Sequence, residues 1–238
     1  MKIIVDGSIF ELDGRGIAKS TIGLYRNVVK FFPETEIYII QTKDFVCEFD
    51  VPGAKKIIVN SLSEALEKVK KIKPDLLHFP NNGNRIEYFK NCKTKKLVTI
   101  HDIIPAMVPQ FFYMSETDVT NYIDKVKQKI KLSDMVATCS KASKYDIAQF
   151  CGFPNSHVVY WGPFLSNKKK YKNKYGKYFL YNGGYDHRKG IEVLIDNFLQ
   201  LKFLGILDAN LVLTGKYSNV CEKLKPLIEY GKQRGWII

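Results

Sequence analysis

Residues 179–190 read FLYNGGYDHRKG, and this short stretch combines the end of a strand, a glycine turn and the start of a helix. The apolar run stops at Gly183 and Gly184, which allow the chain to turn sharply. Apolar residues then recur at helical spacing in GIEVLIDNFLQL, residues 190–201. A strand followed by a turn and a helix is the building block of a parallel α/β sheet.

The same unit repeats through the earlier part of the chain. Strands are predicted at 2–8, 36–42, 56–60, 75–80, 96–102, 134–140 and 157–162, and helices at 19–32, 61–73, 115–132 and 140–152. Strands that alternate with helices and short loops predict an α/β fold with a parallel sheet. Ligands of such sheets bind at the carboxyl ends of the strands.

A Lys-rich stretch without periodicity, SNKKKYKNKYGK, interrupts this alternation. We therefore predict a complete Rossmann-like domain at 1–165, a linker at 166–177 and a partial Rossmann-like domain at 178–238. The last of these has two predicted strands (178–184 and 210–216) and two helices (189–203 and 218–234), which is too little for an independent core. The closing GKQRGWII is typical of the approach to a further strand.

Composition and charge restrict the possible partners. The chain has 238 residues, 45% hydrophobic content and a formal charge of +13, which favours anionic partners: nucleotide-linked substrates, acidic lipid surfaces or nucleic acid. The basic residues are dispersed and form no RNA-recognition or helix-turn-helix signature, so nucleic acid is the least favoured.

The location of the protein is predicted from what the sequence does not contain. The five cysteines are scattered without a CxxC pair, which argues against a disulfide framework or a zinc site and for a reducing compartment. The N-terminus MKIIVDGSIF reads as a strand and not as a signal peptide, and no apolar run approaches the ~20 residues of a membrane span. We expect a cytoplasmic protein, with peripheral contact to an anionic membrane as a further expectation.

The glycine loop DGRGIAKS, residues 13–20, is the first candidate for binding a phosphate. Gly14 and Gly16 permit close backbone approach, and the helix that follows offers unpaired N–H groups. A dinucleotide fingerprint needs a third glycine where this chain has Lys19. Phosphate binding and plain turn chemistry both remain open for this loop.

Two further segments place polar residues at strand ends. His101 and Asp102, in TIHDIIP, follow a buried strand and are the candidate catalytic residues for proton transfer or hydroxyl binding. They are adjacent, so they point to opposite faces and form no dyad by default. In DLLHFPNNG, Asn81 and Asn82 are candidates for binding sugar hydroxyls and are equally good turn formers, whereas His78 is predicted to be a packed core histidine.

Arg188 and Lys189 form the third candidate site, because they precede a helix N-terminus. The helix dipole disfavours cations at that end. A cation pair there is explained if an anion binds with it, and Arg and Lys are the usual complements of a diphosphate.

These motifs, in this order, resemble the family 4 glycosyltransferases of the GT-B fold. The resemblance rests on GRGIAKSTIGLYRNV, DLLHFPNNG, TIHDIIP with PQFF, VATCSKASKYDIAQFCGFP with HVVYWG, and FLYNGGYDHRKGIEVLIDNF with LVLTGK. It covers nearly the whole chain.

The resemblance implies two Rossmann-like domains, an acceptor bound mainly to the first and a nucleotide-sugar bound mainly to the second. It implies that Arg188 and Lys189 hold the donor diphosphate, that Gly14 and Gly16 close on it, and that His101 contacts the transferred sugar. It further implies transfer with retention of configuration, no metal and no cofactor beyond the nucleotide-sugar co-substrate.

The sequence departs from this family in two respects. Gly184 stands where many relatives carry an arginine, so one cation is missing. The family's Glu-x7-Glu motif has no counterpart: Glu222 and Glu229 are spaced Glu-x6-Glu on a Lys-rich helix and are interpreted as surface residues. The donor half of the site is therefore expected to be incomplete.

The leading hypothesis is a glycosyltransferase that acts on a glycan or lipid-linked acceptor, with an incomplete donor domain. A non-catalytic module that binds a glycan or a partner protein is the alternative, and a basic nucleic-acid-binding α/β protein is the third. The open sheet edge of the partial domain predicts self-association or a covering partner.

Overall fold

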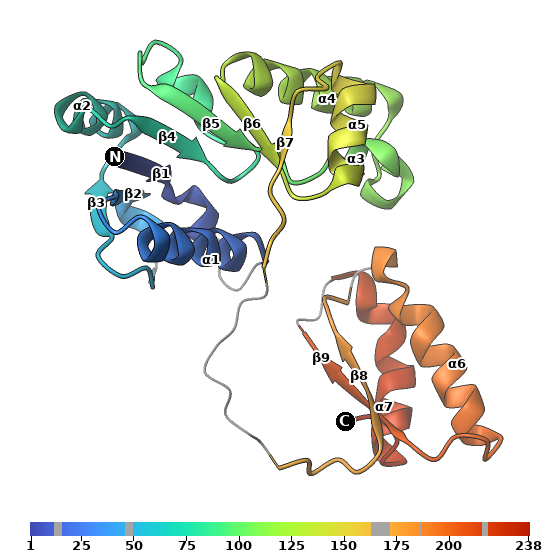
Figure 1. Cartoon of the computed structure of the whole chain (residues 1–238). Helices are drawn as coiled ribbons and strands as arrows, with labels where there is room; N and C mark the ends of the chain where they lie inside the picture. Colours follow the sequence, from blue (N-terminus) through green and yellow to red (C-terminus); the bar gives the residue numbers. More distant parts are fainter. Residues whose placement is uncertain (12–15, 46–49, 163–171, 186, 216–218) are drawn as a thin grey trace. The chain divides into compact units, whose positions relative to one another are not determined.

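The computed structural model describes residues 1–11, 16–45, 50–162, 172–185, 187–215 and 219–238. The chain divides into two compact units, Met1–Ser166 and Asn167–Ile238, which are visible in Figure 1. Part of the predicted linker, residues 166–171, lies outside the described residues, as does Gly14.

The first unit is built on a seven-stranded parallel sheet in the order β3-β2-β1-β4-β5-β6-β7. Its strands are β1 (Lys2–Asp6), β2 (Glu36–Thr42), β3 (Lys55–Val59), β4 (Leu76–Phe79), β5 (Lys95–Thr99), β6 (Met135–Thr138) and β7 (His157–Val158). The register places Ile3 of β1 beside Ile37 of β2 and Leu76 of β4. The predicted α/β class and parallel sheet are confirmed, and the strand order reverses direction between β1 and β4.

The helices of this unit are α1 (Gly16–Phe31), α2 (Leu62–Ile72), α3 (Ile104–Met107), α4 (Glu116–Lys131) and α5 (Lys141–Cys151), with 3-10 turns η1 (Gly7–Glu11), η2 (Lys43–Phe45), η3 (Ile86–Phe89) and η4 (Pro109–Phe112). Three of these helices, α2, α4 and α5, begin at a serine cap. The Ser61 side chain accepts from the Glu64 N–H at the start of α2. Ser115 and Asp118 form a reciprocal capping box at the start of α4. The short helix α3 and the 3-10 turns were not predicted.

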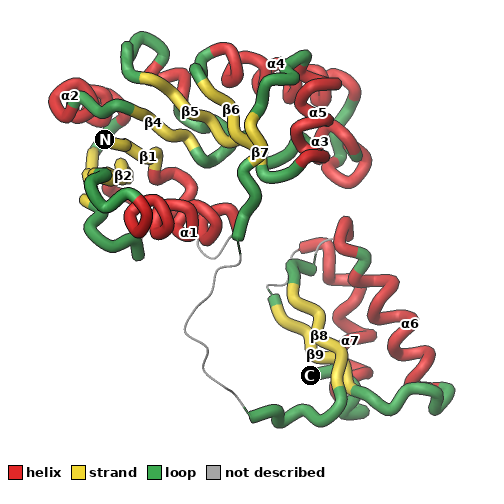
Figure 2. Tube along the Cα trace, in the orientation of Figure 1, coloured by secondary structure: helices red, strands yellow, loops and turns green. Residues whose placement is uncertain are grey.

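Alternate residues of each strand pack into two separate cores, one on each face of the sheet. Ile4, Leu77 and Val98 face the core formed with α2, α4 and α5. Ile3 and Val5 face the other core, which is formed with α1. Figure 2 shows α1 on the face of the sheet opposite to α2, α4 and α5.

The second unit has two parallel strands, β8 (Tyr178–Asn182) and β9 (Asn210–Thr214). Its helices are α6 (Ile191–Phe203) and α7 (Lys225–Gln233), with 3-10 turns η5 (His187–Lys189) and η6 (Asn219–Leu224). The predicted helix 189–203 therefore begins at Ile191, because Gly190 has a left-handed backbone with φ 64° and separates it from η5.

One expectation for this unit is wrong and another is confirmed. It has a hydrophobic core of its own, because α6 and α7 together bury Ile191, Ile195, Leu211 and Ile228. The closing segment approaches a further strand, as predicted, because Ile237 forms a parallel bridge with Leu211 of β9. The Leu211 N–H donates to the Trp236 carbonyl, and the Ile238 N–H donates to the Leu211 carbonyl.

Gly215, directly after β9, packs closely against Gly183, directly after β8. Its φ is +125°, and a Cβ at this position would lie 1.9 Å from the carbonyl oxygen of Gly183. No L-residue fits this contact without movement of the backbone. The turn after β9 therefore depends on glycine.

We predict that Gly215→Ala destabilises the second unit by at least about 2 kcal/mol, because it combines a strained backbone with a direct clash. Gly205→Ala is the matched control: Gly205 also has a positive φ, of +69°, but its Cβ would meet no described atom within 4 Å. Urea unfolding followed by Trp236 fluorescence in a Trp161→Phe background measures the second unit separately. Equal stability losses for the two variants would contradict the clash.

Candidate functional site

His101 lies just past the carboxyl end of β5 and is buried, with 3% of its surface exposed. Its Nε2 lies 2.6 Å from the Pro80 carbonyl oxygen. Because a carbonyl only accepts, Nε2 carries the proton and donates this hydrogen bond. Its Nδ1 is buried and has no hydrogen-bond partner among the described residues.

The imidazole of His101 is held in the neutral form. Burial lowers its pKa below the ordinary value, and the opposing effects of the Pro80 hydrogen bond and of the Asp102 carboxylate are smaller. A neutral ring that donates through Nε2 has an acceptor lone pair at Nδ1. His101 can thus accept a proton or a hydrogen bond from a hydroxyl group.

A hydrogen bond at His101 connects the loop after β4 with the loop after β5. The His101 N–H donates to Asn82 Oδ1 at 2.9 Å, and the Cys139 thiol donates to the His101 carbonyl at 3.0 Å. The Trp161 ring packs edge-on to the imidazole with 4.7 Å between ring centroids. The structure therefore brings together two of the predicted residues, His101 and Asn82, and adds Trp161, which sequence reasoning missed.

The other two predicted residues of this edge, Asn81 and Asp102, are half-buried. The Asn81 carbonyl accepts from the Asn84 N–H at 2.9 Å. Asp102 Oδ1 accepts from the Ile104 N–H at 3.2 Å, at the start of α3. In this structure, these contacts hold loops in place beside His101.

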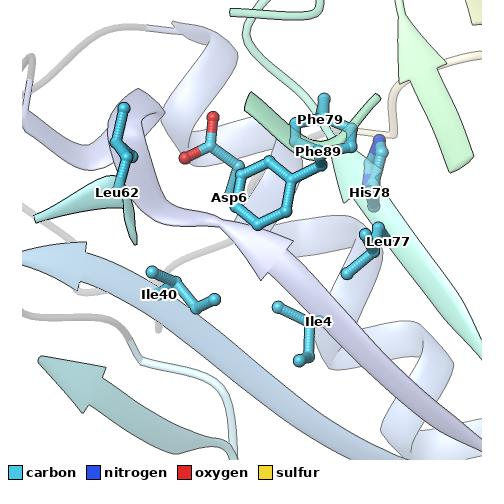
Figure 3. A pocket seen from close by; sticks show the side chains of 8 residues that line it. All are labelled: Ile4, Asp6, Ile40, Leu62, Leu77, His78, Phe79 and Phe89. Atoms are coloured by element: carbon cyan, nitrogen blue, oxygen red, sulfur yellow. The ribbon is translucent and has the colours of Figure 1, made fainter. Parts of the chain in front are cut away.

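Asp6 and Arg85 lie where the strand order reverses, and neither was singled out in the sequence. Asp6, at the end of β1, is 8% exposed and accepts from the Ser8 hydroxyl at 2.6 Å. Arg85 Nη1 lies 3.5 Å from its Oδ1, and Arg85 itself has a left-handed backbone with φ 67°. Figure 3 shows Asp6 among the side chains that line a cavity of about 10 Å³, the size of a single water, most of which are apolar. Asp6 could have been identified from the sequence, because it is an acidic residue directly at the end of an apolar strand.

His78 is a satisfied core histidine, as predicted. Its Nδ1 lies 2.7 Å from the Tyr25 hydroxyl, and its Nε2 lies 2.8 Å from Thr99 Oγ1. Burial lowers its pKa to about 3, with a smaller effect from His101, and burial also raises the pKa of Tyr25. Both ring nitrogens of His78 are therefore engaged inside the protein.

The predicted phosphate-binding residues are divided between the two units. Gly16 is exposed and begins α1, and Gly14 is not described. Arg188 and Lys189 are exposed on η5, directly before α6. Gly190, at the N-cap of α6, has no side chain to accept hydrogen bonds from the first N–H groups of that helix.

The turn before Arg188 and Lys189 is fixed by a hydrogen bond and by a buried tyrosine ring. The Tyr181 hydroxyl donates to the Gly184 carbonyl at 2.7 Å, and Tyr185 is 3% exposed.

Glu222 and Glu229 form exposed ion pairs with Lys225 and Lys232, at 2.5 and 2.9 Å. Their interpretation as surface residues is confirmed.

Comparison with known proteins adds information at the level of the fold. No family model and no curated protein matches the sequence. The structure resembles that of HepE from Anabaena, crystallised with UDP and glucose, with a TM-score of 0.65 and 13% identity. The match covers 100% of this chain and 68% of HepE. It also resembles the lipopolysaccharide outer core galactosyltransferase WaaB (TM-score 0.59, 14% identity, covering 100% of this chain and 67% of WaaB).

A third similar structure is the catalytic domain of starch synthase IV from Arabidopsis thaliana, bound to ADP and acarbose. Its TM-score is 0.63 at 11% identity, and the match covers 99% of this chain and 73% of that domain. All three are glycosyltransferases of the GT-B fold, so the predicted GT-B type of α/β fold is confirmed. The chain spans about two thirds of the length of the first two.

The sequence predicts peripheral contact with an anionic membrane and no membrane-spanning segment. Within the ranges that the structure describes, no helix is both long enough and apolar enough to cross a bilayer.

Protonation of His78 gives a prediction for pH dependence. The unfolded chain takes up this proton near pH 6.5, whereas the folded protein resists it down to about pH 3. The stability is therefore fully present above pH 6.5 and falls as the pH decreases, by about 2 kcal/mol at pH 5 for this group. Urea unfolding at pH 7 and pH 5 is expected to show a smaller loss for His78→Gln than for the wild type. Identical losses would show that His78 titrates normally.

Proposed function

We propose that this chain is a glycosyltransferase that uses a nucleotide-sugar donor and a glycan or lipid-linked acceptor, with retention of configuration. The observation that carries the proposal is the exposed pair Arg188 and Lys189 directly before a helix N-terminus that lacks a capping side chain. Both features attract a diphosphate. The proposal is supported by HepE, crystallised with UDP and glucose, and by starch synthase IV, bound to ADP.

The donor diphosphate would bind to Lys189 and Arg188, with the N–H groups at the start of α6 as further donors. We also propose that Gly14 and Gly16, in the first unit, bind phosphate. Cations and helix N-termini stabilise the charge that develops on a leaving diphosphate. We propose that they do so without a metal and that the nucleotide-sugar is the only co-substrate.

The acceptor would bind to the first unit, with His101 and Asp102 beside the transferred sugar and Asn81 and Asn82 near the hydroxyls. In a retaining reaction the leaving phosphate takes the acceptor proton, so the neutral His101 has the role of positioning a hydroxyl through Nδ1. The scattered cysteines and the charge of +13 support a cytoplasmic location with peripheral contact to an anionic membrane.

A second candidate function is a non-catalytic module that binds a glycan or a partner protein. It is favoured by the burial of His101, which is 3% exposed and packs against Trp161. In the described part of the chain, β8 pairs only with β9, and its side chains Phe179 and Leu180 are 53% and 57% exposed. We propose that a second copy or a partner covers this edge.

Calorimetric titration with UDP-, GDP- and ADP-sugars tests the donor site. We predict that Lys189→Ala weakens the binding about tenfold, because one charge-assisted contact is lost. Lys225→Ala is the matched control, since Lys225 is also exposed in the second unit but pairs with Glu222. Failure of the wild type to bind any of these donors, or equal binding by both variants, would rule the site out.

Transfer assays separate the two candidate functions. We predict that His101→Ala reduces transfer at least about tenfold and weakens donor binding less than Lys189→Ala does, because the cations proposed to hold the diphosphate lie in the other unit. Donor binding without any transfer by the wild type would favour the non-catalytic module.

A further inference from the structure

The amino ends of the strands in the first unit form the edge of the sheet opposite to the one that carries His101. The strands are parallel, and α1, α2 and α4 each run back to the start of the next strand. The last turns of these three helices therefore lie at the same edge as the strand starts. We call this the amino edge. It contains none of the residues proposed for catalysis or for donor binding.

Exposed lysines are concentrated at the amino edge. They occupy the last turns of α1, α2 and α4, the loop between η3 and β5, and the starts of β3 and β5, namely Lys30, Lys55, Lys56, Lys70, Lys71, Lys73, Lys90, Lys93, Lys95 and Lys131. The acidic residues of these segments and of the other strand starts are Glu34, Glu36, Glu67, Asp75 and Asp134. Three of these acids form ion pairs with Lys55, Lys70 and Lys95. The edge keeps an excess of positive charge.

Four of these lysines form no ion pair among the described residues, namely Lys71, Lys73, Lys90 and Lys93. They come from neighbouring segments, because Lys73 precedes β4 and Lys93 precedes β5. These two strands pair from their first residues, Leu76 and Lys95. The dipole of α2 accounts for a cation at Lys71 but not for the lysines before β5. Like charges that lie close together repel one another, so this group favours an anionic partner.

The same edge exposes apolar side chains. Phe31 and Phe32, at the end of α1, are 66% and 56% exposed, and Met1, directly before β1, is 57% exposed. The Phe32 carbonyl accepts from the Thr35 N–H, and the Met1 carbonyl accepts from the Glu36 N–H. These apolar residues therefore lie around one turn, between α1 and β2. An exposed group of large apolar side chains marks a contact surface.

The combination of lysines and phenylalanines favours a lipid surface as the partner. Lys30 Nζ lies 5.4 Å from the centre of the Phe31 ring, and three strand spacings, about 14 Å, separate β2 from β5. Apolar side chains that insert among headgroups, flanked by lysines that face anionic lipids, are typical of peripheral membrane binding. Single-stranded nucleic acid would instead need rings spaced as platforms for successive bases, whereas Phe31 and Phe32 are consecutive.

We propose that the amino edge of the first unit binds the surface of an anionic membrane. Phe31 and Phe32 insert among the headgroups, and the lysines of α2 and of the loop before β5 face the anionic lipids. His101 lies at the opposite edge, so membrane docking leaves the candidate site free. Docking at this edge rests on the proposed peripheral membrane contact and does not depend on donor binding or sugar transfer.

The first test is co-sedimentation of the full chain with lipid vesicles. Vesicles of phosphatidylcholine with phosphatidylglycerol are expected to bind the chain at low salt, and at least about tenfold more tightly than vesicles of phosphatidylcholine alone. Equal binding to both, or binding to neither, would overturn the proposal. Binding of a single-stranded DNA oligonucleotide without binding of vesicles would assign the edge to nucleic acid and also overturn it.

Neutralising the unpaired lysines tests the charged part of the surface. The combined variant Lys71→Gln, Lys73→Gln, Lys90→Gln and Lys93→Gln is expected to weaken vesicle binding at least about tenfold. The matched control removes the same charge from exposed lysines outside the amino edge, with Lys125→Gln, Lys172→Gln, Lys174→Gln and Lys223→Gln. Equal losses for the two variants would show that only the net charge matters, which contradicts a defined surface.

The phenylalanine pair tests the apolar part. Phe31→Ser combined with Phe32→Ser is expected to weaken vesicle binding at least about tenfold, because both rings leave the headgroup region. Both side chains are exposed, so the circular dichroism spectrum is expected to stay unchanged. Phe203→Ser combined with Leu204→Ser is the matched control, since these residues are 76% and 66% exposed at the end of α6. A loss confined to this control would place the contact on the second unit and overturn the proposal.

Failure of this surface and failure of the proposed function give different results. Vesicle binding that none of the variants weakens would keep the membrane contact but contradict the amino edge as its site. Donor titrations contain no lipid, so their outcome decides the glycosyltransferase proposal without affecting the vesicle results.

Discussion

The reversal of strand order between β1 and β4 is the constraint on which the first unit depends. Strands added on either side of this point all run parallel, so their carboxyl ends meet at one edge. Right-handed connections place α2, α4 and α5 on one face and α1 on the other. One topology therefore assembles the edge that carries Asp6, Asn82 and His101.

Two histidines illustrate how similar positions acquire different chemistry. His78 and His101 are both buried, and burial lowers the pKa of each. His78 has partners for both nitrogens and serves packing. His101 has a partner only at Nε2, which fixes its tautomer and leaves a neutral acceptor at Nδ1. The Pro80 carbonyl thus determines what His101 can bind.

Local patterns in the sequence were sufficient to predict the parallel sheet and the capped helices. Strand 36–42 was predicted at its observed bounds, and the predicted helix 61–73 begins at its Ser61 cap. The pairing of Ile237 with Leu211 was missed because it joins segments distant in the chain. The predicted helix 189–203 begins two residues late, at Ile191, because Gly190 has a left-handed backbone conformation that composition does not reveal.

The candidate site was predicted only in part, because some of its contacts join segments that are distant in the chain. His101 and Asn82 could be placed at one edge because both follow strands of a parallel sheet. Trp161 and Arg85 approach this edge from loops. Such features depend on tertiary packing, which no short sequence window contains.

The claim that a nucleoside diphosphate binds at the start of α6 is tested most directly by amide NMR during a titration with UDP, GDP and ADP. For at least one of the three, the earliest and largest shifts are expected at Arg188, Lys189, Gly190 and Ile191. Shifts confined to other parts of the chain, or none at millimolar nucleotide, would contradict the claim.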